Sequence, residues 1–114
     1  MPIRIALLLS LLAAPAFAGT IAVQWPAPVD AAAVQSTLDA RARQMGYRTD
    51  GHDANSFYLT APDATVDGVL RHLIWMEARH VLPAGMRIGV AATKDGPYRA
   101  AYPADLTSFD TRKN

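Results

Sequence analysis

The chain of 114 residues contains no cysteine. It can form no disulfide, it offers no thiol nucleophile, and it has no cysteine to carry a lipid at a processed N-terminus. Stability must therefore come from a hydrophobic core. At about 100 residues outside the N-terminal segment, the chain can bury roughly 60–65% of its unfolded surface, which suits one domain and not two.

The sequence motifs of common enzymes are also missing. There is no glycine-rich phosphate loop, no G-x-S-x-G and no H-E-x-x-H. The one glutamate, Glu77, falls near the middle of the apolar side of a predicted helix. Because buried charges are normally paired, we expect Glu77 to bond Arg41, Arg87 or a backbone group. A raised pKa that serves acid–base chemistry is the alternative. We predict a non-catalytic protein without a cofactor.

Metal ligands are few. The chain has three histidines: His52, His72 and His80. On a helix, His72 and His80 lie too far apart to bind one ion. His52 lies in the segment 50–55, Asp-Gly-His-Asp-Ala-Asn, which resembles a fragment of a calcium loop but lacks the glutamate at the twelfth position. We therefore expect a solvated hairpin loop here and no metal site.

The chain has no surplus of positive charge. Eleven Lys and Arg, of which Arg4 is one, oppose ten Asp and Glu. Without the N-terminal segment the net charge is zero with His neutral, so binding to nucleic acid is not expected. A neutral chain gains little solubility from self-repulsion, which is compatible with a homo-oligomer or an unknown protein partner.

The N-terminus has the pattern of a secretory signal peptide over residues 1–18. One early charge, Arg4, precedes the apolar run Ile5–Ala14, and Ala16–Ala18 is an A-x-A cleavage signal. The run is shorter than the roughly 20 residues needed to span a bilayer. We predict cleavage after Ala18, export to the periplasm or secretion, and no transmembrane helix in the mature protein.

Hydrophobic spacing predicts strands that alternate with helices. The alternating segments predict four strands, Thr20–Gln24, Tyr47–Thr49, Phe57–Thr60 and Met86–Ala91. One helix is predicted from an Asp30 cap to a stop at Gly46, and a second over Val66–Val81. Asp50-Gly51 is a hairpin-turn signal between the second and third strands.

This order predicts an α+β fold, a ferredoxin-like βαββαβ two-layer sandwich with an antiparallel sheet and two helices on one face. The domain is expected over residues 19–93, with an irregular C-terminal segment over residues 94–114. The alternative is a three-stranded sandwich in which Tyr47–Thr49 is loop.

The helix predicted over Val66–Val81 carries a candidate binding surface. At about 100° per residue its aliphatic residues form one stripe, and Trp75 falls nearly opposite the centre of that stripe. The other residues of this outer surface are Arg71, His72 and Arg79. Trp and Arg are enriched at binding hot spots, so these four residues are predicted to bind a protein partner. The alternative is that a neighbouring loop, such as the C-terminal segment, covers Trp75.

The face of the sheet away from the helices is a second candidate surface. Strand alternation places Gln24, Tyr58 and Arg87 there. Ile21–Gln24 and the element order resemble the peptidoglycan-binding SPOR domains, which implies cell-wall glycan as the alternative ligand for this face. The Tyr-Arg-Val and Gly-Pro-Phe segments of that family are not found before the second helix.

In element order the chain also resembles propeptide-like protease inhibitors, whose free C-terminal tail enters a protease cleft. The segment from Lys94 onward is the part that would correspond to this tail. The prediction we favour is an exported, non-catalytic domain that binds another protein through the outer helix surface, the C-terminal segment, or both.

Overall fold

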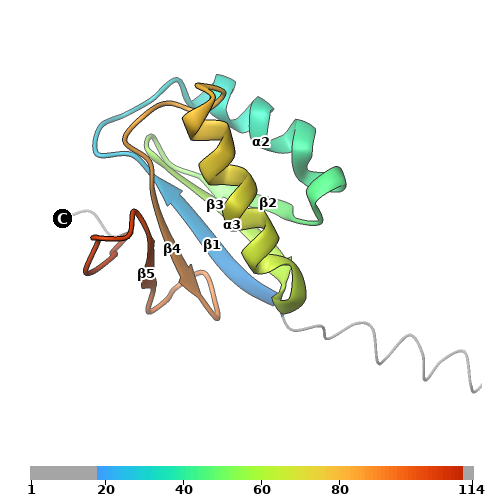
Figure 1. The fold of residues 1–114 in the computed structure, drawn as a ribbon, viewed down its shortest axis with the longest axis vertical. Coiled ribbons are helices and arrows are strands. Elements are labelled where there is room, and N and C mark those ends of the chain that lie inside the picture. Colours follow the sequence, from blue (N-terminus) through green and yellow to red (C-terminus); the bar gives the residue numbers. More distant parts are fainter. Residues whose placement is uncertain (1–17, 112–114) are drawn as a thin grey trace, which may run out of the picture.

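The computed structural model describes residues 18–111 (Figure 1). Its elements in chain order are β1 (Ala18–Gln24), α2 (Ala31–Met45), β2 (Arg48–His52), β3 (Ser56–Pro62), α3 (Asp63–Ala78), β4 (Arg87–Ala91) and β5 (Arg99–Tyr102). The predicted signal peptide lies outside the described residues except for Ala18, the first residue of β1. No helix within residues 18–111 is long and apolar enough to cross a membrane.

The five strands form one sheet in the order β2-β3-β1-β4-β5. Every neighbouring pair is antiparallel. β1 is the central strand, and all seven of its residues pair with β3, from Ala18 opposite Pro62 to Gln24 opposite Ser56. The α+β class, the antiparallel sheet and the order of the six predicted elements are therefore confirmed, and β5 is an addition.

Strand alternation separates two sides of the sheet. Ile21 and Val23 of β1, together with Phe57 and Leu59 of β3, point into the main core. Ala22 and Tyr58 follow Ile21 and Phe57 in their strands and belong to a separate cluster on the other side of the sheet. The period of two in the sequence thus specifies which side chains meet the helices.

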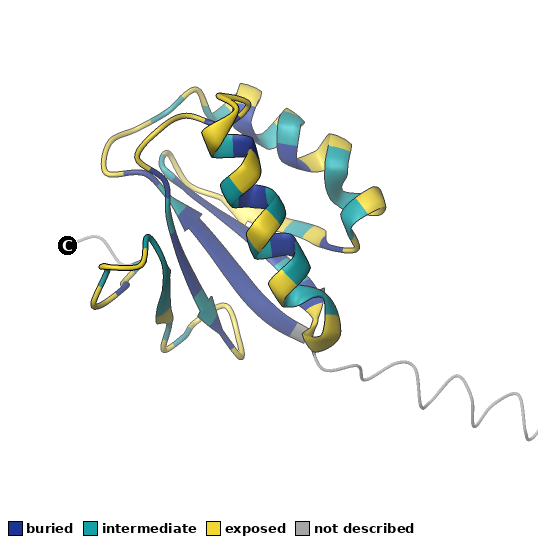
Figure 2. Cartoon of the chain, in the orientation of Figure 1, coloured by how far each residue is buried: buried dark blue, intermediate teal, exposed yellow. Residues whose placement is uncertain are grey.

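Both helices cover the same face of the sheet (Figures 1 and 2). Val34 and Leu38 of α2 join the main core. The α3 residues that are buried in the main core are Val69, Leu73 and Met76. Figure 2 shows that each helix keeps its exposed residues on the side away from the sheet, as an amphipathic stripe requires.

The ends of α2 follow the predicted signals. The Asp30 side chain accepts a hydrogen bond of 3.2 Å from the Ala33 backbone N–H. Gly46 ends the helix in the left-handed region, at φ 85°, and its N–H bonds to the Ala42 carbonyl. A glycine costs little in this conformation, which explains its place at the C-terminus of the helix.

α3 differs from its predicted bounds at both ends. It begins at Asp63, directly after β3, and ends at Ala78. His80 has φ 65° and turns the chain out of the helix. Val81 was predicted to lie in the buried stripe, and that prediction is wrong: the residue follows the helix end and is 38% exposed.

The second strand also differs from its prediction. Asp50-Gly51 was expected to be the hairpin turn, but both residues lie inside β2. Gly51 has φ 91°, and the pairing of β2 with β3 shifts register between Thr49 and His52. A glycine at a β-bulge produces the same local signal as a turn, and the reversal of the chain follows at residues 53–55.

The C-terminal segment, expected to be irregular over residues 94–114, contains β5 and continues the fold. β5 pairs with β4 across a register shift between Ile88 and Gly89. Its four residues lie between Pro97 and Pro103, so the sequence signal for a strand is short and interrupted. After β5 the chain returns across the sheet, and Phe109 is only 9% exposed.

Candidate functional site

Trp75 lies on the outer side of α3 and is 45% exposed. Its neighbours in the helix, Leu73 and Met76, are fully buried against the sheet. The outward direction expected from the periodicity therefore agrees with the structure. The C-terminal segment does not cover Trp75, because it packs on the opposite face of the sheet.

Two predicted site residues contact the Trp75 ring. The His72 imidazole stacks on it, with 5.5 Å between ring centroids and an interplanar angle of 18°. The Arg79 guanidinium carbon lies 5.2 Å from the indole centroid. Arg79 follows the last residue of the helix and still reaches the ring. Such a cation–π contact contributes about 0.5–1 kcal/mol at an exposed site.

Arg41 of α2 joins this group, although the sequence suggested it only as a partner for Glu77. Its Nη1 lies 3.2 Å from Nε2 of His72. A guanidinium has no acceptor, so it donates and His72 accepts through an unprotonated nitrogen. Burial, and after it the charge of Arg41, lowers the pKa of His72 below 6.5. We call Arg41, Arg71, His72, Trp75 and Arg79 the α3 surface.

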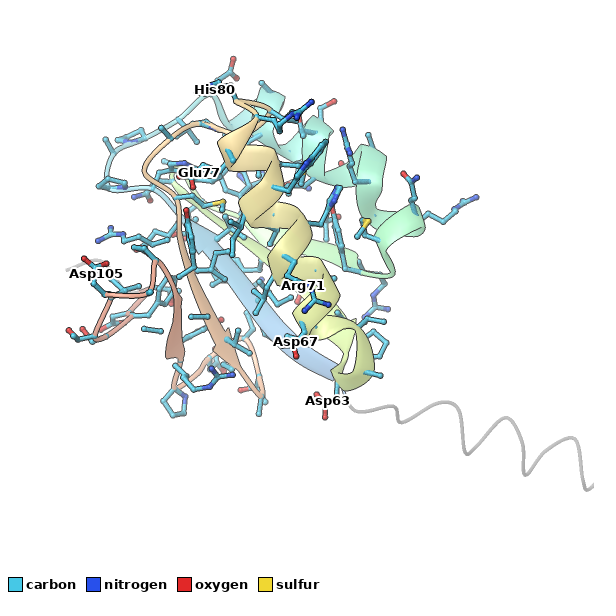
Figure 3. The ribbon with its side chains drawn as sticks, viewed as in Figure 1. Asp63, Asp67, Arg71, Glu77, His80 and Asp105 are labelled. Atoms are coloured by element: carbon cyan, nitrogen blue, oxygen red, sulfur yellow. The ribbon has the colours of Figure 1, made fainter. Side chains whose placement is uncertain are left out.

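Arg71, the fourth predicted residue of this surface, is exposed on the outer side of α3 (Figure 3). It lies one helical turn before Trp75 and makes no contact with the ring that resembles those of His72 and Arg79. The α3 surface thus presents an exposed aromatic ring with guanidinium groups around it. This combination suits a protein partner with apolar and acidic groups.

The second predicted surface is closed in the structure. Gln24, Tyr58 and Arg87 do lie on the same outer face of the sheet, and Arg87 donates to Gln24 over 3.3 Å. However, Tyr58 is only 8% exposed. The residues that cover this face come from the C-terminal segment, namely Tyr98, Ala100, Leu106 and Phe109.

Gly89 explains how the C-terminal segment fits so closely. A Cβ built at Gly89 would lie 2.4 Å from Cδ1 of Phe109, a distance that real structures do not show. The Phe109 ring therefore occupies the space above a residue without a side chain. The prediction of an open sheet face was wrong because alternation gives the direction of a side chain and not what lies over it. A glycine inside β4 was the one available signal of a close approach.

Glu77 has a structural role. Its Oε2 accepts hydrogen bonds of 2.9 Å from the backbone N–H groups of Gly85 and Met86. Its Oε1 accepts a bond of 2.6 Å from the Tyr102 hydroxyl, which raises the pKa of Tyr102. Of the partners predicted from the sequence, the backbone is the one found. The carboxylate joins the end of α3 to the following loop and to β5.

The His52 segment has the character of a hairpin end. The His52 ring stacks on Phe57 with 5.0 Å between centroids, and its Nδ1 lies 2.9 Å from the Asp53 carbonyl oxygen. No group of three side chains suited to a metal ion occurs within residues 18–111.

A cavity of about 710 Å³ lies at the opposite end of α3 from Trp75. Its polar lining consists of Asp63, Asp67 and Arg99, and its other lining residues are Gly19, Val66, Val90, Ala91, Ala92 and Pro97. No pattern in the sequence predicts this cavity, and no contact within the described part of the chain points to a ligand for it.

No protein-family model matches this chain, and no curated protein or solved structure matches it significantly.

Proposed function

We propose that this chain is an exported, non-catalytic domain that binds a protein partner through the α3 surface. The observation that carries the proposal is the 45% exposure of Trp75 on a helix that buries Val69, Leu73 and Met76 on its other side. Large aromatic side chains are highly buried on average, so an exposed indole supported by His72 and Arg79 suggests an interaction site.

The other parts of the chain support α3 as the binding surface. The sheet face that would bind a cell-wall glycan is occupied by the protein's own Phe109. The C-terminal segment that would act as a free inhibitory tail is the segment that supplies Phe109. Glu77, the carboxylate with the best claim to catalysis, already accepts three hydrogen bonds from its own chain.

The proposal includes a finer description of the fold and a location. The strand order β2-β3-β1-β4, with both helices on one face, supports a ferredoxin-like arrangement to which β5 is added. The N-terminal pattern over residues 1–18 supports export to the periplasm or secretion.

Replacement of Trp75 by alanine tests the function. Tagged full-length protein is expressed in its own cells, and chemical crosslinking captures what is bound. We expect Trp75→Ala to reduce the captured protein at least tenfold while the free energy of unfolding changes by no more than about 1 kcal/mol, as for exposed substitutions.

Val81→Ala is the matched control, because Val81 is the other large exposed hydrophobic residue within residues 18–111 and lies outside the α3 surface. Its capture should equal that of the wild type. Equal capture by the wild type and Trp75→Ala would contradict the proposal. A large loss of stability in Trp75→Ala would also contradict it, since Trp75 would then be a packing residue.

A further inference from the structure

Gly68 is a glycine in the interior of α3 that packing within the described chain does not require. A Cβ built at Gly68 has no heavy atom within 4 Å. Alanine would therefore fit there, and in a helix interior it is more favourable than glycine by about 1 kcal/mol. The α3 backbone therefore has open space above it at Gly68, and the glycine makes the helix less stable than an alanine would.

Gly68 belongs to the same outward row as Trp75. At about 100° per residue, Ala64 and Gly68 both fall within about 20° of Trp75 around the helix axis. Ala64 is exposed. The outer side of α3 therefore has a large ring in its C-terminal half and a shallow run of two small residues in its N-terminal half, where another chain can approach closely.

Two opposite charges lie beside this row. Asp67 and Arg71 are both exposed on α3 (Figure 3). Asp67 lies on the flank of the helix, where it also lines the cavity beside the N-terminal end of α3. The two residues lie on the same side of the row, about 80° and 40° from Trp75 around the axis. Asp67 lies beside the N-terminal half of the row, which has the two small residues. Arg71 lies toward the C-terminal half, which has Trp75.

We propose that the partner of the α3 surface is a second copy of this chain, with the two α3 helices packed antiparallel across a two-fold axis. An antiparallel register that places Arg71 opposite Asp67 of the second copy also places Trp75 within one residue of its Ala64. Helical side chains lean toward the N-terminus of their own helix, so the Trp75 ring reaches from Ala64 toward Gly68 of the second copy.

The symmetry makes this arrangement self-consistent. A two-fold axis perpendicular to the plane of the two helices exchanges the copies and leaves the flank with Arg71 and Asp67 on the same side of that plane in both. Arg71 of each copy therefore meets Asp67 of the other copy, and this charge pair forms twice. The near-neutral charge of the chain does not oppose self-association. This inference rests on the proposed function, because it names the partner of the same surface.

Charge reversal tests the register. The protein is purified from its own cells, and sedimentation equilibrium gives its mass over a range of concentrations. We expect the wild type to reach twice the mass of one chain. Asp67→Arg and Arg71→Asp should each remain at the mass of one chain, because like charges then face each other twice. The double variant Asp67→Arg/Arg71→Asp should regain the doubled mass.

Gly68→Leu gives a second test that does not depend on charge. Leucine occupies open space in the single chain, and it is a better helix former than glycine, so the variant should be at least as stable as the wild type. It should nevertheless remain at the mass of one chain, since the leucine fills the place of the Trp75 ring.

A wild type with the mass of one chain at every concentration would overturn the inference, as would a Gly68→Leu variant that still doubles its mass. If the chain is single and Trp75→Ala loses the capture of a different protein, this inference falls and the proposed function stands. If the chain is single and nothing is captured through Trp75, both fall.

Discussion

The outer face of the sheet and the outer surface of α3 both point away from the main core, yet only one of them is free. The sheet face lies under the chain's own Phe109, whereas Trp75 on α3 is 45% exposed. Periodicity in the sequence predicts both directions equally well. The difference arises from a short segment far along the chain that packs on one surface and not on the other.

The largest expected effect is on the covered face. Phe109→Ala should lower the free energy of unfolding by about 3 kcal/mol, because it removes a buried aromatic ring and leaves a cavity beside Tyr58. Chemical denaturation measures this change. Trp75→Ala, at no more than about 1 kcal/mol, is the matched aromatic substitution on the exposed surface. Equal losses in the two variants would remove the contrast between the surfaces.

Gly89→Ala should cost about 1–3 kcal/mol, because its Cβ would overlap the Phe109 ring. A double-mutant cycle isolates that cause. In a chain that already carries Phe109→Ala, the same glycine substitution should cost less than about 0.5 kcal/mol, since the overlapping ring is absent. A cost that is unchanged in this background would show that Gly89 serves another purpose.

The smallest effect is expected on the exposed surface, as a dependence on pH. The pKa of His72 is below 6.5 in the folded chain, so below pH 6.5 the unfolded chain binds more protons at this residue. Stability from His72 is complete above pH 6.5 and falls as the pH decreases toward the folded pKa. Denaturation from pH 7 to 5 should show a steeper loss in the wild type than in His72→Gln. Parallel curves would contradict this role for His72.

Much of the fold could be predicted because it depends on local patterns. The Asp30 cap, the Gly46 stop and the alternation around Ile21 are each determined by neighbours in the sequence. Gly51 was misinterpreted because a β-bulge and a turn demand the same backbone freedom. Val81 was misplaced because the helix pattern continues for three residues after the chain has left the helix.

The sites were harder to predict because they depend on contacts between distant segments. Phe109 covers Tyr58 across 51 positions of sequence, and only Gly89 hinted that something approached the sheet. Arg41 was named from the sequence as a partner for Glu77, but it contacts His72 instead. The partners of Glu77 include Tyr102 on a strand that the sequence did not clearly predict.

The most direct test of this contrast is photo-crosslinking in cells, with a photoreactive residue at position 75 in one variant and at position 58 in another. We expect a discrete band of higher mass from position 75. The probe at position 58 should react with the C-terminal segment of its own chain and produce no such band. A higher-mass band from position 58 and none from position 75 would contradict the assignment of the α3 surface as the binding site.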